Sequence, residues 1–165
     1  MELGGGRSGT NVIRSLLKFD LSSIPAATSI TSANLNLWFS STNSNIPIDI
    51  SLHKVTKAWE ENQANWNSAK TSTPWSLKGG DFVNTPLSTI SGITESGDLI
   101  TGQMSWSIPS ALVSNWITNP SSNYGFLLKS DNETVTTYKK FISSEHSIDE
   151  QYHPLLVITY NTAAR

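Results

Sequence analysis

The strongest constraint on the fold is a pair of alternating runs between residues 13 and 39. In the first run, Ile13, Ser15, Leu17 and Phe19 alternate with Arg14, Leu16, Lys18 and Asp20; in the second, Ala33, Leu35, Leu37 and Phe39 alternate with Asn34, Asn36 and Trp38. A period of two residues is typical of β-strands that bury one face only. Pro25 lies in the polar segment between the runs and predicts a turn. The two runs therefore predict two half-buried strands of a β-sandwich; the pattern leaves open whether they are neighbours in one sheet.

The same alternation recurs along the rest of the chain. It predicts strands over about 13–20, 31–39, 48–53, 103–108, 124–129, 134–143 and 155–160, with a short strand near Phe82. Residues 109–117 have apolar residues at helical spacing after Pro109 and predict one short helix. With one short helix and no regular alternation of strands and helices, the pattern favours an all-β, antiparallel, jelly-roll-like β-sandwich formed by a single domain over residues 1–165.

Composition excludes several classes of protein. The formal net charge of −2 provides no basic surface for nucleic acid, and the chain has no cysteine for disulfides or thiolate metal sites. No apolar run approaches the roughly 20 residues of a membrane-spanning helix. The first residues lack the apolar region of a signal peptide, so we expect the chain to be a piece excised from a longer protein.

Several segments, in order, resemble the disaggregatase-related repeat, or DNRLRE domain. They are RSLLKFDLSSIP, LHKVTKAWEENQANWN, GGDF, VSNWITNPSSNYGFLLK, FISSE and PLLVITY. The resemblance implies a sandwich similar to jelly-roll carbohydrate-binding modules, occurring as a module of large secreted and cell-surface proteins. It implies an extracellular role with a surface or matrix polysaccharide as partner, including acidic polysaccharides.

The chain departs from the family pattern at its start. Members usually open with a strand and an Asn-Tyr-Gly turn before a Gly-rich loop, whereas this chain begins at that loop, Gly4–Gly6. We therefore expect the domain to lack the family's first strand. An unfilled position leaves a sheet edge open, which predicts self-association with another chain.

The outward face of the predicted strands suggests a sugar-binding platform. Its candidate residues are Trp38, His53, Arg14, Lys18 and Asn36, with Trp75 of the long polar loop as a second choice. An aromatic ring can stack on a pyranose, and a guanidinium can bind a uronate carboxylate through two hydrogen bonds. The alternative is that a loop covers Trp38 and the polar residues form an ordinary solvated face. Trp59 and Trp66 are expected to anchor the long loop.

Metal binding and catalysis have weaker support. Asp81, after two glycines, and Asp20, at a strand end, could hold a structural Ca²⁺, but turn capping is the alternative role of each. His53, Tyr138 and Arg14 or Lys18 could together perform β-elimination on a uronate. The interpretation is a non-catalytic carbohydrate-binding or adhesion module. A polysaccharide lyase or hydrolase and a structural cell-envelope spacer remain as alternatives.

Overall fold

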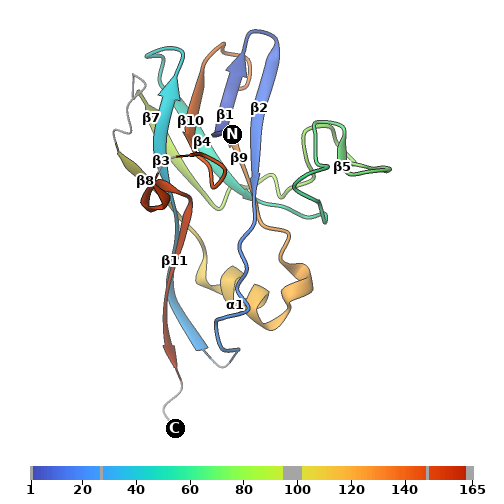
Figure 1. Ribbon diagram of the computed structural model, residues 1–165, viewed down its shortest axis with the longest axis vertical. Coiled ribbons are helices and arrows are strands. Elements are labelled where there is room, and N and C mark those ends of the chain that lie inside the picture. Colours follow the sequence, from blue (N-terminus) through green and yellow to red (C-terminus); the bar gives the residue numbers. More distant parts are fainter. Residues whose placement is uncertain (1, 27, 95–101, 148, 163–165) are drawn as a thin grey trace.

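The computed structural model describes residues 2–26, 28–94, 102–147 and 149–162, which form a curled antiparallel sheet (Figure 1). Its strands are β1 (Glu2–Ser8), β2 (Asn11–Leu17), β3 (Thr28–Thr42), β4 (Ile48–Lys54), β7 (Ser88–Ile93), β8 (Gln103–Ser107), β9 (Phe126–Ser130), β10 (Tyr138–Ile142) and β11 (Leu155–Thr162). The strand order is β11-β3-β10-β1-β2-β9-β4-β7, with β8 also paired to β3. Every pairing between these strands is antiparallel.

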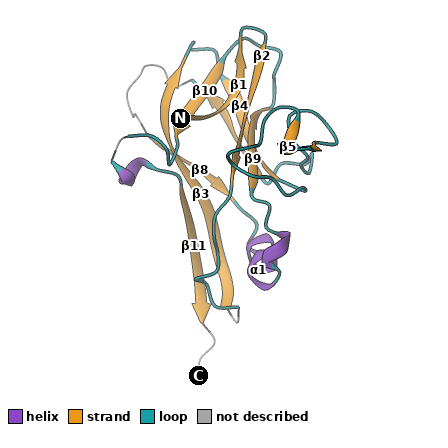
Figure 2. Cartoon of the chain, turned by 45° about the vertical axis from the view of Figure 1, so that its right-hand side comes forward, coloured by secondary structure: helices purple, strands orange, loops and turns teal. Residues whose placement is uncertain are grey.

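The long strand β3 joins the parts of the sheet. Its residue Leu35 pairs with Leu156 of β11 and with Trp106 of β8, so these two strands flank it on opposite edges. Farther along β3, Phe39 pairs with Phe141 of β10. The β3–β11 ribbon extends beyond the rest of the sheet in Figure 2. The fold confirms the predicted all-β class, a jelly-roll-like antiparallel sandwich with one short α-helix.

The core lies between the facing halves of the curled sheet. It contains the inward-facing apolar residues of β3, β4, β8, β9 and β10, including Leu35, Leu37, Phe39, Ile50, Leu52, Trp106, Phe126, Leu128 and Phe141. Trp106 is fully buried, and its indole N–H donates to the Ile50 carbonyl over 2.9 Å. Trp116 of the helix that follows Pro109 is also buried.

The triple glycine is part of a strand, so its interpretation as a flexible loop is wrong. Gly4, Gly5 and Gly6 lie in β1 and pair with β10. A Cβ on Gly5 would lie 2.9 Å from the Lys129 carbonyl carbon of β9. Gly6 has a φ of +128°, and a Cβ there would lie 2.3 Å from the Thr137 carbonyl oxygen. These glycines permit a close approach of β1 to neighbouring backbones.

The remaining elements agree with the predictions in part. The helix α1 (Ser110–Thr118) follows Pro109, as expected. The long loop contains a small hairpin of β5 (Ser68–Lys70) and β6 (Thr73–Pro74), and Phe82 makes an isolated bridge with Val55 in place of a strand. Two short 3₁₀ turns are η1 (Pro120–Ser122) and η2 (Glu150–Tyr152). Within the described part of the chain, every helix is too short or too polar to cross a membrane.

Candidate functional site

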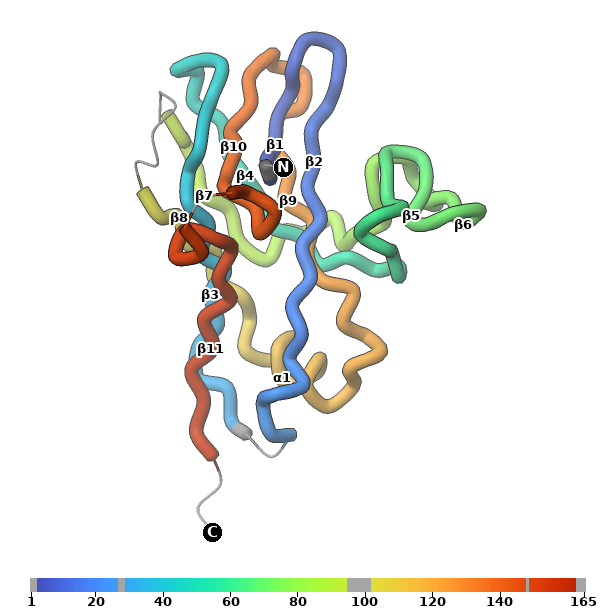
Figure 3. The backbone as a smooth tube through the Cα atoms, viewed as in Figure 1, coloured from blue at the N-terminus to red at the C-terminus, as the bar shows by residue number. Residues whose placement is uncertain are grey.

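The long loop, residues 56–86, packs on the outer face of β2, β9 and β4, and its hairpin projects to one side (Figure 3). Beneath it, Leu127 of β9 and His53 of β4 are buried. The Trp75 indole N–H donates to the Asn65 carbonyl over 2.8 Å, and that of Trp59 donates to the Tyr124 carbonyl over 2.7 Å. Trp75 and Trp59 therefore anchor the loop. This is the role predicted for Trp59. Trp75 is predicted as a second-choice sugar-binding residue, but it is only 6% exposed.

Arg14 connects this loop to the sheet. Its Nε and Nη2 donate to the two carboxylate oxygens of Glu133, each over 2.7 Å, and its Nη1 donates to the Gly79 carbonyl over 3.1 Å. The guanidinium carbon also lies 5.0 Å from the Trp66 ring centre and 5.5 Å from that of Phe82. A guanidinium with this set of partners fixes the loop on β2, and a sugar carboxylate would have to compete with Glu133 for it.

Trp66 is the open aromatic residue of the loop. It is 40% exposed, and Arg14 contacts its ring. Gly79 packs so closely that an added Cβ would lie 2.8 Å from the Trp66 Cη2 atom, and its φ of +90° favours glycine. The indole therefore has a fixed orientation while a large part of it faces solvent. From the sequence, Trp66 has only a predicted anchoring role. The Gly79-Gly80 pair, which lies beside Trp66 in space, is the sequence signal of a close contact in this loop.

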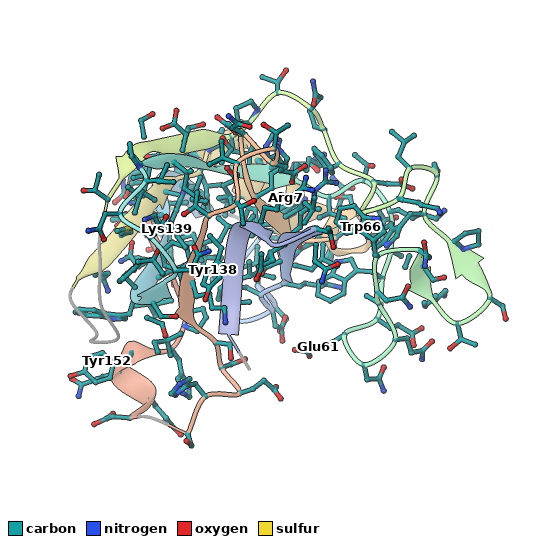
Figure 4. The ribbon with its side chains drawn as sticks, turned by 90° about the horizontal axis from the view of Figure 1, so that it is seen from above. Arg7, Glu61, Trp66, Tyr138, Lys139 and Tyr152 are labelled. Atoms are coloured by element: carbon teal, nitrogen blue, oxygen red, sulfur yellow. The ribbon has the colours of Figure 1, made fainter. Side chains whose placement is uncertain are left out.

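A groove runs along β2 and the residues after it, beside Trp66. It has a volume of about 550 Å³, and its lining includes Arg14, Lys18, Trp59, Glu61, Trp66 and Trp75. A second groove, of about 810 Å³, continues toward Ile24, Pro25 and Ile117. Lys18, Phe19, Trp59 and Glu61 line both, so the two form one continuous trough. Glu61 and Trp66 lie on the same side of the molecule in Figure 4.

The structure separates the predicted sugar platform into three places: the trough, the strand β3 and, for His53, a buried position beneath the long loop. Arg14, Lys18 and Trp75 line the trough, but Trp38 and Asn36 are on β3. In the strand order, β10 and β1 lie between β3 and β2, so these residues do not share one surface. Trp38 packs edge-on against Tyr152, with ring centres 5.2 Å apart. Tyr152 and Trp66 lie on opposite sides of Figure 4.

His53 is covered by the long loop, so it is not on the outward surface. It is 3% exposed, its Nδ1 lies 2.9 Å from the Val83 carbonyl oxygen, and its ring contacts Phe82. Burial is the main cause that lowers the pKa of His53 below its ordinary value. The hypothetical elimination site is not assembled, because Tyr138 is on β10, which β1, β2 and β9 separate from β4.

The two aspartates considered for Ca²⁺ cap turns. Asp20 accepts from the Ser22 amide over 2.9 Å, a bond that lowers its pKa. Asp81 accepts from the Ser76 and Leu77 amides, each over 3.0 Å. Burial tends to raise the pKa of Asp81, but these bonds and Lys57 bring it below its ordinary value. Among the residues that the structure describes, no three acidic or histidine side chains gather as metal ligands would.

The fold and trough define a β-sandwich domain with an open, aromatic-lined surface beside one sheet. The chain matches the family model of the disaggregatase related repeat domain over residues 1–158 and belongs to that family. This confirms the resemblance found in the sequence. No curated protein matches the chain.

Proposed function

We propose that this domain binds a polysaccharide in the trough beside β2 without cleaving it. The observation that carries the proposal is the exposed, oriented indole of Trp66 at the rim of a groove that also contains Trp59. A fixed aromatic face can stack on the apolar side of a pyranose without losing side-chain freedom on binding. As a disaggregatase-related repeat, the domain would act as an extracellular or cell-surface adhesion module.

The shape and charge of the trough favour a polymer that can carry carboxylates. Two grooves that share four lining residues form a continuous channel, which suits consecutive sugar units better than a single monosaccharide. Lys18 lies where the grooves meet and is exposed, so its ammonium can bind a uronate carboxylate. Glu61 lies at the same junction and can accept hydrogen bonds from sugar hydroxyls.

The alternatives have less support in the described residues. A lyase that used His53 as its base would need access to a ring that lies beneath Phe82 and Val83. A spacer with no ligand would explain Trp66 as a packing partner of Arg14 and Gly79, but it gives no role to the trough beside it. The binding module accounts for both observations.

A glycan array run with and without Ca²⁺ tests the proposal. We expect the wild-type domain to retain an acidic polysaccharide and Trp66→Ala to bind it at least tenfold more weakly, or about 1.4 kcal/mol. Lys18→Gln should lose acidic glycans selectively. Trp38→Ala, on the opposite side, is the matched control and should bind normally. Retention of no glycan would favour the spacer. Unsaturated sugar products appearing on incubation with uronate polymers would favour the lyase.

A further inference from the structure

The strand β11 presents an open backbone edge. In the described residues it pairs only with β3. The Ala33 carbonyl accepts from Ile108 on the β8 side, so the next residue, Asn34, directs its backbone groups toward Val157 of β11. Because backbone direction alternates along a strand, the N–H and C=O groups of Leu156 and Ile158 point away from β3. They are available to another strand.

From Leu155 to Ile158 this edge lacks the charges, prolines and bulges that usually prevent pairing; the register with β3 shifts only between Thr159 and Tyr160. The strand reads LLVITYNT, with no charged residue and no proline. Leu155 and Val157 are 52% and 39% exposed, and they lie beside Asn36 and Asn34 on the outer face of the sheet. The ribbon of β11 and β3 extends beyond the rest of the sheet in Figure 1. The residues of β11 do not line the trough, but Pro154, which precedes Leu155, does, so the two surfaces adjoin only at the start of β11.

We propose that β11 pairs antiparallel with β11 of a second copy of this chain. A two-fold axis brings identical strands together in opposite directions, which is the arrangement that antiparallel bonds require. An uncharged strand meets its own copy without like-charge repulsion across the axis. The outward backbone groups of Leu156 and Ile158 would then be bonded, and Val157 would lie against the second copy. This locates the predicted self-association at β11; the lack of the family's first strand stays a prediction.

Sedimentation velocity and amide exchange test this pairing. The wild-type chain should dimerise as its concentration rises, and the Leu156 and Ile158 amides, which exchange quickly in the monomer, should become protected. Val157→Lys puts like charges across the interface at an exposed position, so association should weaken at least tenfold. Ile46→Lys is the matched control at another exposed apolar residue, 47% accessible, and should dimerise normally.

Two results would overturn the proposal. One is a monomer at every concentration up to the solubility limit. The other is a dimer that Val157→Lys leaves unchanged and in which the Leu156 and Ile158 amides still exchange quickly. Val157→Lys should retain glycan binding, so failure of this proposal and failure of the proposed function give different results.

Discussion

Replacing Arg14 by lysine tests how the long loop is held on the sheet. Lysine keeps the positive charge near Glu133, but it cannot donate to both carboxylate oxygens and to the Gly79 carbonyl in the same geometry. It also loses the flat contact with Trp66. The Arg14 and Glu133 side chains are only 16% and 19% exposed, so water replaces these contacts poorly.

The expected magnitude follows from the lost contacts. One hydrogen bond to a charged partner contributes about 1.5–3 kcal/mol and one to a neutral carbonyl about 1 kcal/mol. The cation–π contact adds roughly 0.5–1 kcal/mol. Lysine recovers part of this sum, so we expect Arg14→Lys to lower the free energy of unfolding by about 2 kcal/mol. With a urea dependence of about 2 kcal/mol per molar, the midpoint should fall by about 1 M.

Urea unfolding followed by tryptophan fluorescence measures this change. Arg7→Lys is the matched control, because Arg7 donates only to the backbone carbonyls of Gly9 and Glu133. It should cost less than about 1 kcal/mol. If Arg14→Lys destabilises the domain no more than Arg7→Lys does, the guanidinium does not hold the loop, and the account of the oriented Trp66 is wrong.

Three further predictions concern stability. Burial lowers the pKa of His53 in the folded chain, so the unfolded chain takes up a proton first, near pH 6.5. The free energy of unfolding should therefore fall as the pH drops below about 6.5, and it should fall less in His53→Leu. Urea titrations at several pH values measure both. Gly6→Ala should lower the free energy of unfolding by about 2 kcal/mol or more, because its Cβ would meet the Thr137 carbonyl. Gly9→Ala, at a φ of +57° with open space around it, should lower it by about 1 kcal/mol. Thermal melting compares the two. Asp81→Asn should lower the free energy of unfolding by about 1 kcal/mol, because its carboxylate caps a turn. Calorimetry should show that Ca²⁺ leaves the wild-type melting temperature unchanged.

The strands with strict alternation could be predicted because their side chains report which face is buried. The alternation over residues 31–39 and 155–160, for example, predicts the strands β3 and β11. The strand β7 was missed because it is largely exposed and has few apolar residues in alternation. The triple glycine forms a strand and not the predicted loop, because composition does not distinguish a flexible segment from one where backbones approach closely.

The site was predicted only in part because its assembly depends on strand order. Arg14, Asn36 and His53 each point outward from half-buried strands in the sequence pattern, but alternation does not say which strands are neighbours. The contrast between Trp66 and Trp75 depends on contacts distant in sequence. Arg14 contacts the first at the surface, and the buried indole of the second donates to the Asn65 carbonyl within the folded loop.

The most direct test of the account is to follow the indole N–H signals of the six tryptophans by NMR while a retained acidic polysaccharide is added. We predict that the signals of Trp66 and Trp59 shift with saturation and that the signal of Trp38 stays in place. A shift of Trp38 without Trp66, or no shift of any indole on binding, would contradict the claim that the trough beside β2 is the binding site.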